Sequence, residues 1–91
     1  MFNYLEIESM DLLIKAVQEY EVDLRTNKQI LVNAAIVCDA AMGSDDIVKK
    51  HIERLNQALV KLEKAAQLAS DVAQALKADR QQAISVYKDE G

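Results

Sequence analysis

The sequence predicts an all-α protein, an antiparallel hairpin of two long helices that pairs with another hairpin into a four-helix bundle. Its 91 residues include no proline and only two glycines, so little interrupts helix propagation. Hydrophobic residues make up 51% of the chain and aromatic residues only 4%, a composition typical of helical proteins rather than sheets. Apolar residues also recur at spacings of three and four along two long stretches, which is the period of a helix.

The first helix is expected over about residues 9–42. Before it, Leu5 and Ile7 alternate with glutamates, and this period of two predicts an extended segment. Ser9 suits the N-cap position, where its hydroxyl accepts a hydrogen bond from an amide of the first turn. Asp11, one turn into the helix, is favoured by the positive end of the helix dipole.

The stripe of the first helix runs for about 33 residues, or about 50 Å at 1.5 Å per residue, a length that suits a coiled-coil-like bundle. Asn27 interrupts it, either as a buried asparagine that sets register through a paired hydrogen bond or as one that faces solvent. Tyr20 is expected to pack in the core with its hydroxyl at the rim. The apolar members of the stripe are Met10, Leu13, Val17, Tyr20, Leu24, Leu31, Ala34, Cys38 and Ala41.

A turn is expected at residues 43–44, because Gly43 suits the left-handed position after a helix and Ser44 can cap the next one. The second helix is then expected over about residues 45–87, and the whole chain, 1–91, forms a single domain. Its stripe has an alanine-rich middle, which predicts that the helices approach most closely there. The members of this stripe are Ile52, Leu55, Leu59, Leu62, Ala66, Ala69, Ala73 and Leu76.

Both stripes are wider than one partner helix covers, and a chain this short buries little surface by itself. We therefore expect a homodimer or a heterodimer with another helical hairpin. The predicted partner interface consists of Met10, Leu13, Val17, Tyr20, Leu24, Leu31, Ile52, Leu55, Leu59, Leu62 and Leu76.

Several functional classes are disfavoured. The net charge of −4 and the lack of a basic stripe argue against nucleic acid as a partner. The longest apolar run, Ala34 to Cys38, is far shorter than the ~20 residues of a membrane span. His51 and Cys38 are the only residues of their types, so a buried cysteine and a histidine at the edge of the stripe are favoured over a nucleophilic or metal-binding pair. We expect no catalytic residues, no cofactor and no metal.

The layout resembles the Trp-Xaa-Gly family of small type VII secretion proteins over almost the whole chain. The resemblance lies in the segment Leu5-Glu6-Ile7-Glu8-Ser9, two long helices, and Ala41-Met42-Gly43 in the place of the family's motif. Gly43 matches the motif, and Ala41 stands where the family has tryptophan. In the C-terminal tail, Tyr87 is followed by Glu90 at a spacing one residue shorter than that of the family's secretion signal.

This resemblance implies a helical hairpin that pairs with a homologous chain or with the helical N-terminal region of a larger secreted toxin. It also implies a bacterial protein that stays in the cytoplasm until it is exported without a signal peptide, with Tyr87 and Glu90 in a secretion tail. The alternative is an intracellular helical adaptor, chaperone or phage-type structural subunit with no role in export. Both hypotheses describe a non-enzymatic interaction protein.

Overall fold

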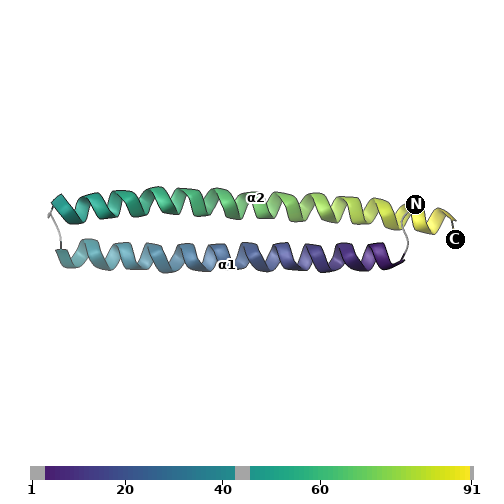
Figure 1. Ribbon diagram of the computed structural model, residues 1–91, viewed down its shortest axis with the longest axis horizontal. Helices are drawn as coiled ribbons and strands as arrows, with labels where there is room; N and C mark the ends of the chain where they lie inside the picture. Colours follow the sequence, from purple (N-terminus) through teal and green to yellow (C-terminus); the bar gives the residue numbers. More distant parts are fainter. Residues whose placement is uncertain (1–3, 43–45, 91) are drawn as a thin grey trace.

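The computed structural model describes residues 4–42 and 46–90, which form two helices, α1 (Tyr4–Met42) and α2 (Asp46–Glu90). No strand occurs within these ranges. The helices lie side by side and antiparallel, so that the start of α1 and the end of α2 share one end of the molecule (Figure 1). The hairpin measures 68 × 14 × 13 Å. The prediction of an all-α helical hairpin is confirmed, while the predicted turn at Gly43 and Ser44 lies outside the described residues.

The prediction of an extended segment before Ser9 is wrong, because α1 begins at Tyr4. Ser9 lies within the helix, and its hydroxyl donates to the carbonyl of Leu5 at 2.9 Å instead of capping the first turn. Ile7 is half-buried, one turn before Met10 on the same side of the helix, so its burial favours helix over the short alternating pattern. At the other end, α2 continues to Glu90, three residues beyond the expected boundary.

The two helices meet along a seam of residues spaced alternately by three and four. Every seam residue is buried or half-buried, which is the pattern of a coiled-coil contact. On α1 the seam comprises Ile7, Met10, Ile14, Val17, Glu21, Leu24, Lys28, Leu31 and Ala35. On α2 it comprises Val48, Ile52, Leu55, Leu59, Leu62, Ala66, Ala69, Ala73, Leu76, Arg80 and Ala83.

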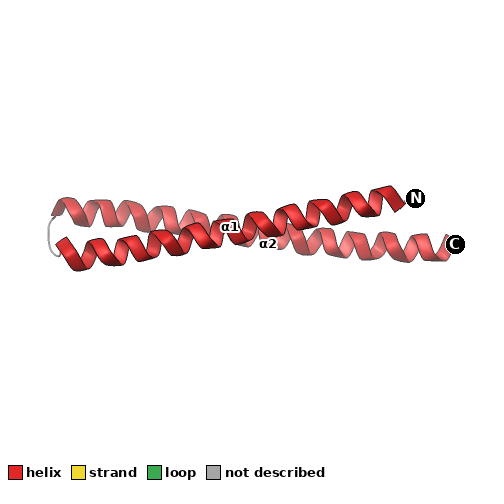
Figure 2. Cartoon of the chain, turned by 90° about the horizontal axis from the view of Figure 1, so that it is seen from below, coloured by secondary structure: helices red, strands yellow, loops and turns green. Residues whose placement is uncertain are grey.

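Three consecutive seam residues in the middle of α2 are buried. Ala66, Ala69 and Ala73 expose only 1–6% of their surface, and Figure 2 shows the helices crossing at a shallow angle near the middle of their length. Small side chains allow two helices to approach closely at such a crossing. The alanine-rich stretch is therefore buried, as close packing requires, and a closest approach of the helices at this point stays a prediction.

The core of the hairpin is thin. Among the described residues the buried hydrophobic side chains are Ile14 and four alanines, and no large side chain is fully buried. Two helices in contact along one seam enclose little volume, so most large apolar side chains keep part of their surface in water. The candidate site is defined by the apolar side chains that remain exposed and by the side of the hairpin on which they lie.

Candidate functional site: an apolar face on one side of the hairpin

Three ion pairs that join the two helices lie along one edge of the seam. Glu63 accepts a hydrogen bond from the Lys28 Nζ atom at 2.7 Å and lies 3.5 Å from the Arg25 guanidinium. Near the other end of the hairpin, Arg80 pairs with Asp11. These contacts define a charged face and fix the register of the two helices.

The charges on this face shift one another's protonation. The hydrogen bond and positive charge of Lys28 lower the pKa of Glu63 below its ordinary value, with a smaller contribution from Arg25. Arg25 also donates a hydrogen bond to Glu21 at 2.9 Å, and this bond raises the pKa of the Arg25 guanidinium. Glu21 and Lys28 are themselves seam residues, so the network explains how charged side chains are accommodated at the contact between the helices.

The opposite edge of the seam carries none of these three ion pairs. Arg25 and Glu63 form an ion pair, and in the sequence each comes directly after a seam residue. Tyr20 and Val72 each come directly before one. A step of one residue forward or backward moves a side chain about 100° around the helix in opposite directions. Tyr20 and Val72 therefore lie on the side of the hairpin away from the ion pairs.

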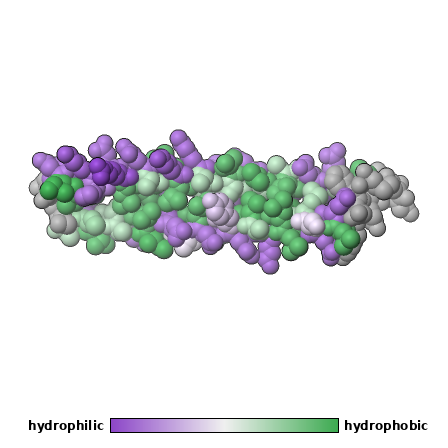
Figure 3. Space-filling model, viewed as in Figure 1, coloured by the Kyte–Doolittle hydropathy of each residue, from purple (hydrophilic) through white to green (hydrophobic). Residues whose placement is uncertain are grey.

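We call this side the apolar face. Its large side chains expose from 37% (Val86) to 67% (Val37) of their surface. Figure 3 shows a broad face on which hydrophobic residues occupy the middle of both helices and hydrophilic residues follow the outer edges. Exposed apolar patches of this kind mark interaction sites. The apolar face consists of Leu13, Ala16, Tyr20, Ile30, Ala34, Val37 and Ala41 on α1, and Ala58, Ala65, Leu68, Val72, Ala75 and Val86 on α2.

The residues predicted for the partner interface divide between the seam and the apolar face. Leu13 and Tyr20 are more than half exposed and belong to the apolar face. The others are half-buried in the seam within the hairpin: Met10, Val17, Leu24, Leu31, Ile52, Leu55, Leu59, Leu62 and Leu76. Whether a partner covers the remaining surface of these residues stays a prediction.

Asn27 and Tyr20 lie outside the packing of the hairpin. Asn27 is exposed, and it follows Tyr20 by seven residues along the same line of α1, so it interrupts the apolar face rather than the seam. Within the hairpin alone, the solvent-facing interpretation of Asn27 holds, and the expected core position of Tyr20 does not, since its side chain is 58% exposed.

Leu68, Ile30 and Val37 are members of the apolar face that the predicted interface left out. Each is spaced by three or four residues from another member of the face, so helical spacing was the signal available in the sequence. The sequence does not show which of two neighbouring lines of apolar residues, the seam or the apolar face, the second helix covers.

Near the turn, Cys38 and His51 line one apolar depression of about 180 Å³ together with Val48, Ile52 and Leu55. The structure thus brings the lone cysteine and histidine to the same place, although Cys38 is exposed rather than buried. Within the described residues no group of three histidine, cysteine or acidic side chains is placed to hold a metal ion. The depression offers an apolar surface with no third polar group to orient the histidine.

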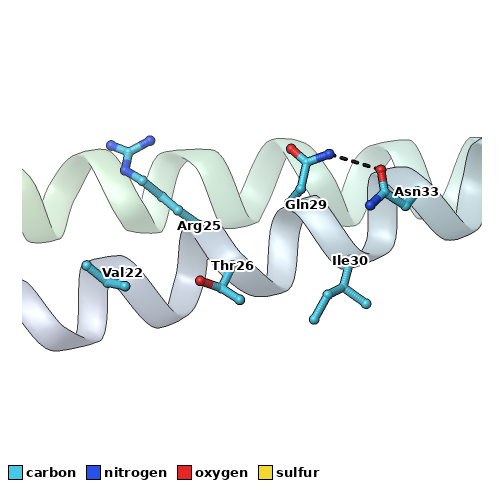
Figure 4. A pocket seen from close by; sticks show the side chains of 6 residues that line it. All are labelled: Val22, Arg25, Thr26, Gln29, Ile30 and Asn33. Atoms are coloured by element: carbon cyan, nitrogen blue, oxygen red, sulfur yellow. Dashed lines mark hydrogen bonds between the residues drawn. The ribbon is translucent and has the colours of Figure 1, made fainter.

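A second depression lies on the outer side of α1. In Figure 4 all of its lining side chains come from this one helix, and Ile30 points away from α2. The Gln29 amide donates to Asn33 at 3.0 Å across one turn. An open hollow on a single helix encloses no ligand, so it adds exposed surface rather than a binding pocket.

The predicted secretion tail is described only as backbone. Tyr87 and Glu90 fall within α2, and their side chains lie outside what the structure describes.

Neither helix, over the residues described, combines the length and hydrophobicity needed to cross a bilayer. Comparisons with protein-family models, curated proteins and solved structures found no match to the chain.

Proposed function

We propose that this chain is a non-enzymatic interaction protein whose apolar face docks another helical hairpin. The observation that carries the proposal is the difference between the two sides of the hairpin. One side is joined by ion pairs between Asp11, Arg25, Lys28, Glu63 and Arg80, whereas the other presents large apolar side chains to solvent.

The energetics favour a helical partner. A straight face 68 Å long matches another pair of long helices far better than a compact globular surface. Covering roughly 600 Å² of apolar surface would contribute about 15 kcal/mol before the entropic costs of association. The core of the isolated hairpin is thin, so docking of a partner would also cover seam residues that remain half exposed. This additional burial also favours association.

Within this class we propose a type VII secretion role, as an exported hairpin or as the targeting partner of a larger secreted toxin. Two long helices, α1 ending at Met42 and α2 beginning at Asp46, support it, since this is the layout that the Trp-Xaa-Gly resemblance implies. On this proposal the chain is cytoplasmic before export. An intracellular adaptor would use the same face, and a secretion ATPase or toxin gene beside the coding sequence would favour the first role over the second.

The test of the docking face is a matched pair of substitutions on α2. Val72 lies on the apolar face, whereas Val60 directly follows the seam residue Leu59 and lies on the side of the ion pairs; both are exposed, by 41% and 54%. We expect Val72→Glu to weaken the assembly, because it places a charge in the interface, and Val60→Glu to leave it intact. Light scattering measures the mass, and circular dichroism checks that both variants stay helical.

The wild-type chain should form a stable assembly alone or with a helical hairpin encoded beside it. A folded chain that binds neither itself nor such a hairpin, or an assembly equally sensitive to both substitutions, would contradict the proposal.

A further inference from the structure

A second line of exposed apolar side chains runs along the outer side of α1. Leu12 and Val22 expose 71% and 62% of their surface, and neither belongs to the seam or to the apolar face. Three open hollows follow this line, and Figure 4 shows the third of them. These side chains stay exposed after the packing of the hairpin and after the docking of its apolar face.

The hollows repeat every seven residues. They begin at Glu8, Lys15 and Val22, and the lining of each includes the residues three, four and seven positions further along the helix. Four residues in this arrangement surround an inserted side chain where two helices pack as a coiled coil. A repeat of seven over three hollows fits a partner helix that lies along α1 at a small angle. The outer side of α1 is thus shaped for another helix rather than for a small ligand.

The hollows lie on the side of α1 away from the apolar face. Glu8, Lys15 and Val22 each come directly after a seam residue. Leu13 and Tyr20, which belong to the apolar face, each come directly before one. These steps turn the side chains in opposite directions around the helix. A helix docked in the hollows would therefore leave the apolar face accessible to its own partner.

This part of the hairpin is acidic. Residues 4–23 carry six acidic side chains and one basic one, Lys15. Among the charged residues that line the hollows, Asp11 and Arg25 form ion pairs within the hairpin. The other four are exposed, and three of them are acidic, namely Glu8, Glu19 and Asp23. A partner that lies over these carboxylates gains most if it carries positive charge.

We infer that the outer side of α1, from Glu8 to Gln29, binds a basic amphipathic helix of another protein. The apolar side chains of that helix enter the three hollows, and its lysine or arginine side chains lie against the exposed carboxylates. The same negative charge repels nucleic acid and anionic lipid surfaces. It also opposes a second copy of this chain, because a two-fold contact would place the same acidic surface on both sides. The inference goes beyond the proposed function, since it concerns another side of the hairpin and another kind of partner.

The size of the contact predicts weak and reversible binding. The stretch from Glu8 to Gln29 is about 32 Å long, and a helix is about 10 Å across. It therefore offers roughly 300 Å² per partner, compared with about 800 Å² in a standard protein interface. A contact of this size suits a single helical segment. Its affinity should fall as salt is added, because the flanking charges supply part of the attraction.

A pair of synthetic peptides tests the shape and the charge of the site. Each peptide has about four heptads with leucine at the first and fourth positions, and the flanking positions carry lysine in one peptide and glutamate in the other. Each is titrated into the isotope-labelled full chain, and amide shifts are followed by nuclear magnetic resonance. We expect the lysine peptide to bind about tenfold more tightly at low salt, with its shifts concentrated between Glu8 and Gln29. No binding of the lysine peptide, or equal binding of both peptides, would overturn the inference.

Val22→Lys and Val60→Lys form a matched pair of variants. Both valines are exposed and directly follow a seam residue, Val22 on α1 and Val60 on α2. Val22→Lys should raise the Kd of the lysine peptide about tenfold or more, because it places a charge of the peptide's own sign between two hollows. Val60→Lys should leave the Kd unchanged, and circular dichroism checks that both variants stay helical. Equal effects of the two substitutions would overturn the assignment of the site.

Charge reversal tests the carboxylates separately. Glu19→Lys with Asp23→Lys should also weaken binding of the lysine peptide and should strengthen binding of the glutamate peptide. The control reverses Glu53 and Asp71, which are exposed acidic residues on the outer side of α2. Equal weakening in the control would show that only the overall charge of the chain matters and would overturn the inference.

The apolar face is the other surface to which the peptide can bind, and Val72→Lys distinguishes it. Binding that is lost with Val72→Lys and kept with Val22→Lys would overturn the inference and leave the proposed function standing. A self-assembly of the wild-type chain that Val22→Lys dissociates would show that a further copy covers the outer side, and it would also overturn the inference. A chain that binds the peptide at Val22 but docks no hairpin on its apolar face would contradict the proposed function alone.

Discussion

Replacing Ala66 by leucine would insert three carbon atoms at a closed part of the seam. Ala66 is 1% exposed, and the Lys28–Glu63 and Arg80–Asp11 pairs set a register that places it near the level of Leu24. Overpacking of this kind typically costs about 1–3 kcal/mol, because neighbouring side chains leave their preferred rotamers or the helices separate. For a domain of this size, each kcal/mol corresponds to a change of about 4–8 °C in Tm. The expected fall in Tm is therefore about 5–20 °C.

The matched control is Ala78→Leu, at an exposed position on the outer side of the same helix. Leucine and alanine differ little in helix propensity, so this variant should melt within a few degrees of the wild type. Thermal melts followed by circular dichroism at one fixed protein concentration compare the three chains, since association makes Tm depend on concentration. A variant Ala66→Leu that melts at or above the temperature of Ala78→Leu would refute the close packing of the alanines.

Two further predictions follow from the seam and its ion pairs. Leu24→Asp or Leu59→Asp places a carboxylate in the seam, so we expect a loss of several kcal/mol in stability and dissociation of any assembly, measured by circular dichroism and light scattering. Lys28 lowers the pKa of Glu63 in the folded chain below that of a free glutamate. The ion pair therefore stabilises the fold at a pH above the pKa of the free side chain. This stabilisation is lost as the pH falls through the lower pKa of Glu63 in the folded chain. The Tm advantage of the wild type over Glu63→Gln should thus shrink as pH falls from about 7 to about 3; a constant difference would contradict this.

The second helix could be predicted from the sequence almost in full. Its seam is built from leucine and alanine at regular spacing from Ile52 to Leu76, and every one of these positions is buried or half-buried. An uninterrupted apolar line of this kind leaves one choice of contact face, and the alanine-rich centre indicates where the helices approach most closely.

The contact face of the first helix was harder to predict from the sequence because its seam is not uniformly apolar. Glu21 and Lys28 occupy seam positions, so an apolar stripe drawn through the sequence passes instead through Leu13 and Tyr20, one residue away. The pairing of Lys28 with Glu63 is what makes the charged seam tolerable, and that contact joins residues 35 positions apart. Hydrophobic spacing within one helix carries no information about such a pair.

The start of the first helix illustrates a different limit. Four alternating residues predict a strand only weakly, because helix and strand patterns coincide over so short a length. Burial of Ile7 beside the end of α2, where Ala83 is fully buried, is a tertiary effect that local alternation does not show. The neighbouring helix, rather than the segment's own sequence, determines its conformation here.

The exposed surface also differs between the helices, and this bears on which of them forms the centre of an assembly. Among the described residues, α1 exposes eight large hydrophobic side chains and α2 exposes five. Those of α1 include Leu12, Val22 and Ile36, which lie outside both the seam and the apolar face. A helix that is apolar on several sides is typical of the interior of a bundle. Docking of the apolar face alone would leave Leu12, Val22 and Ile36 exposed, so the exposed apolar surface of α1 extends beyond the face that both helices share.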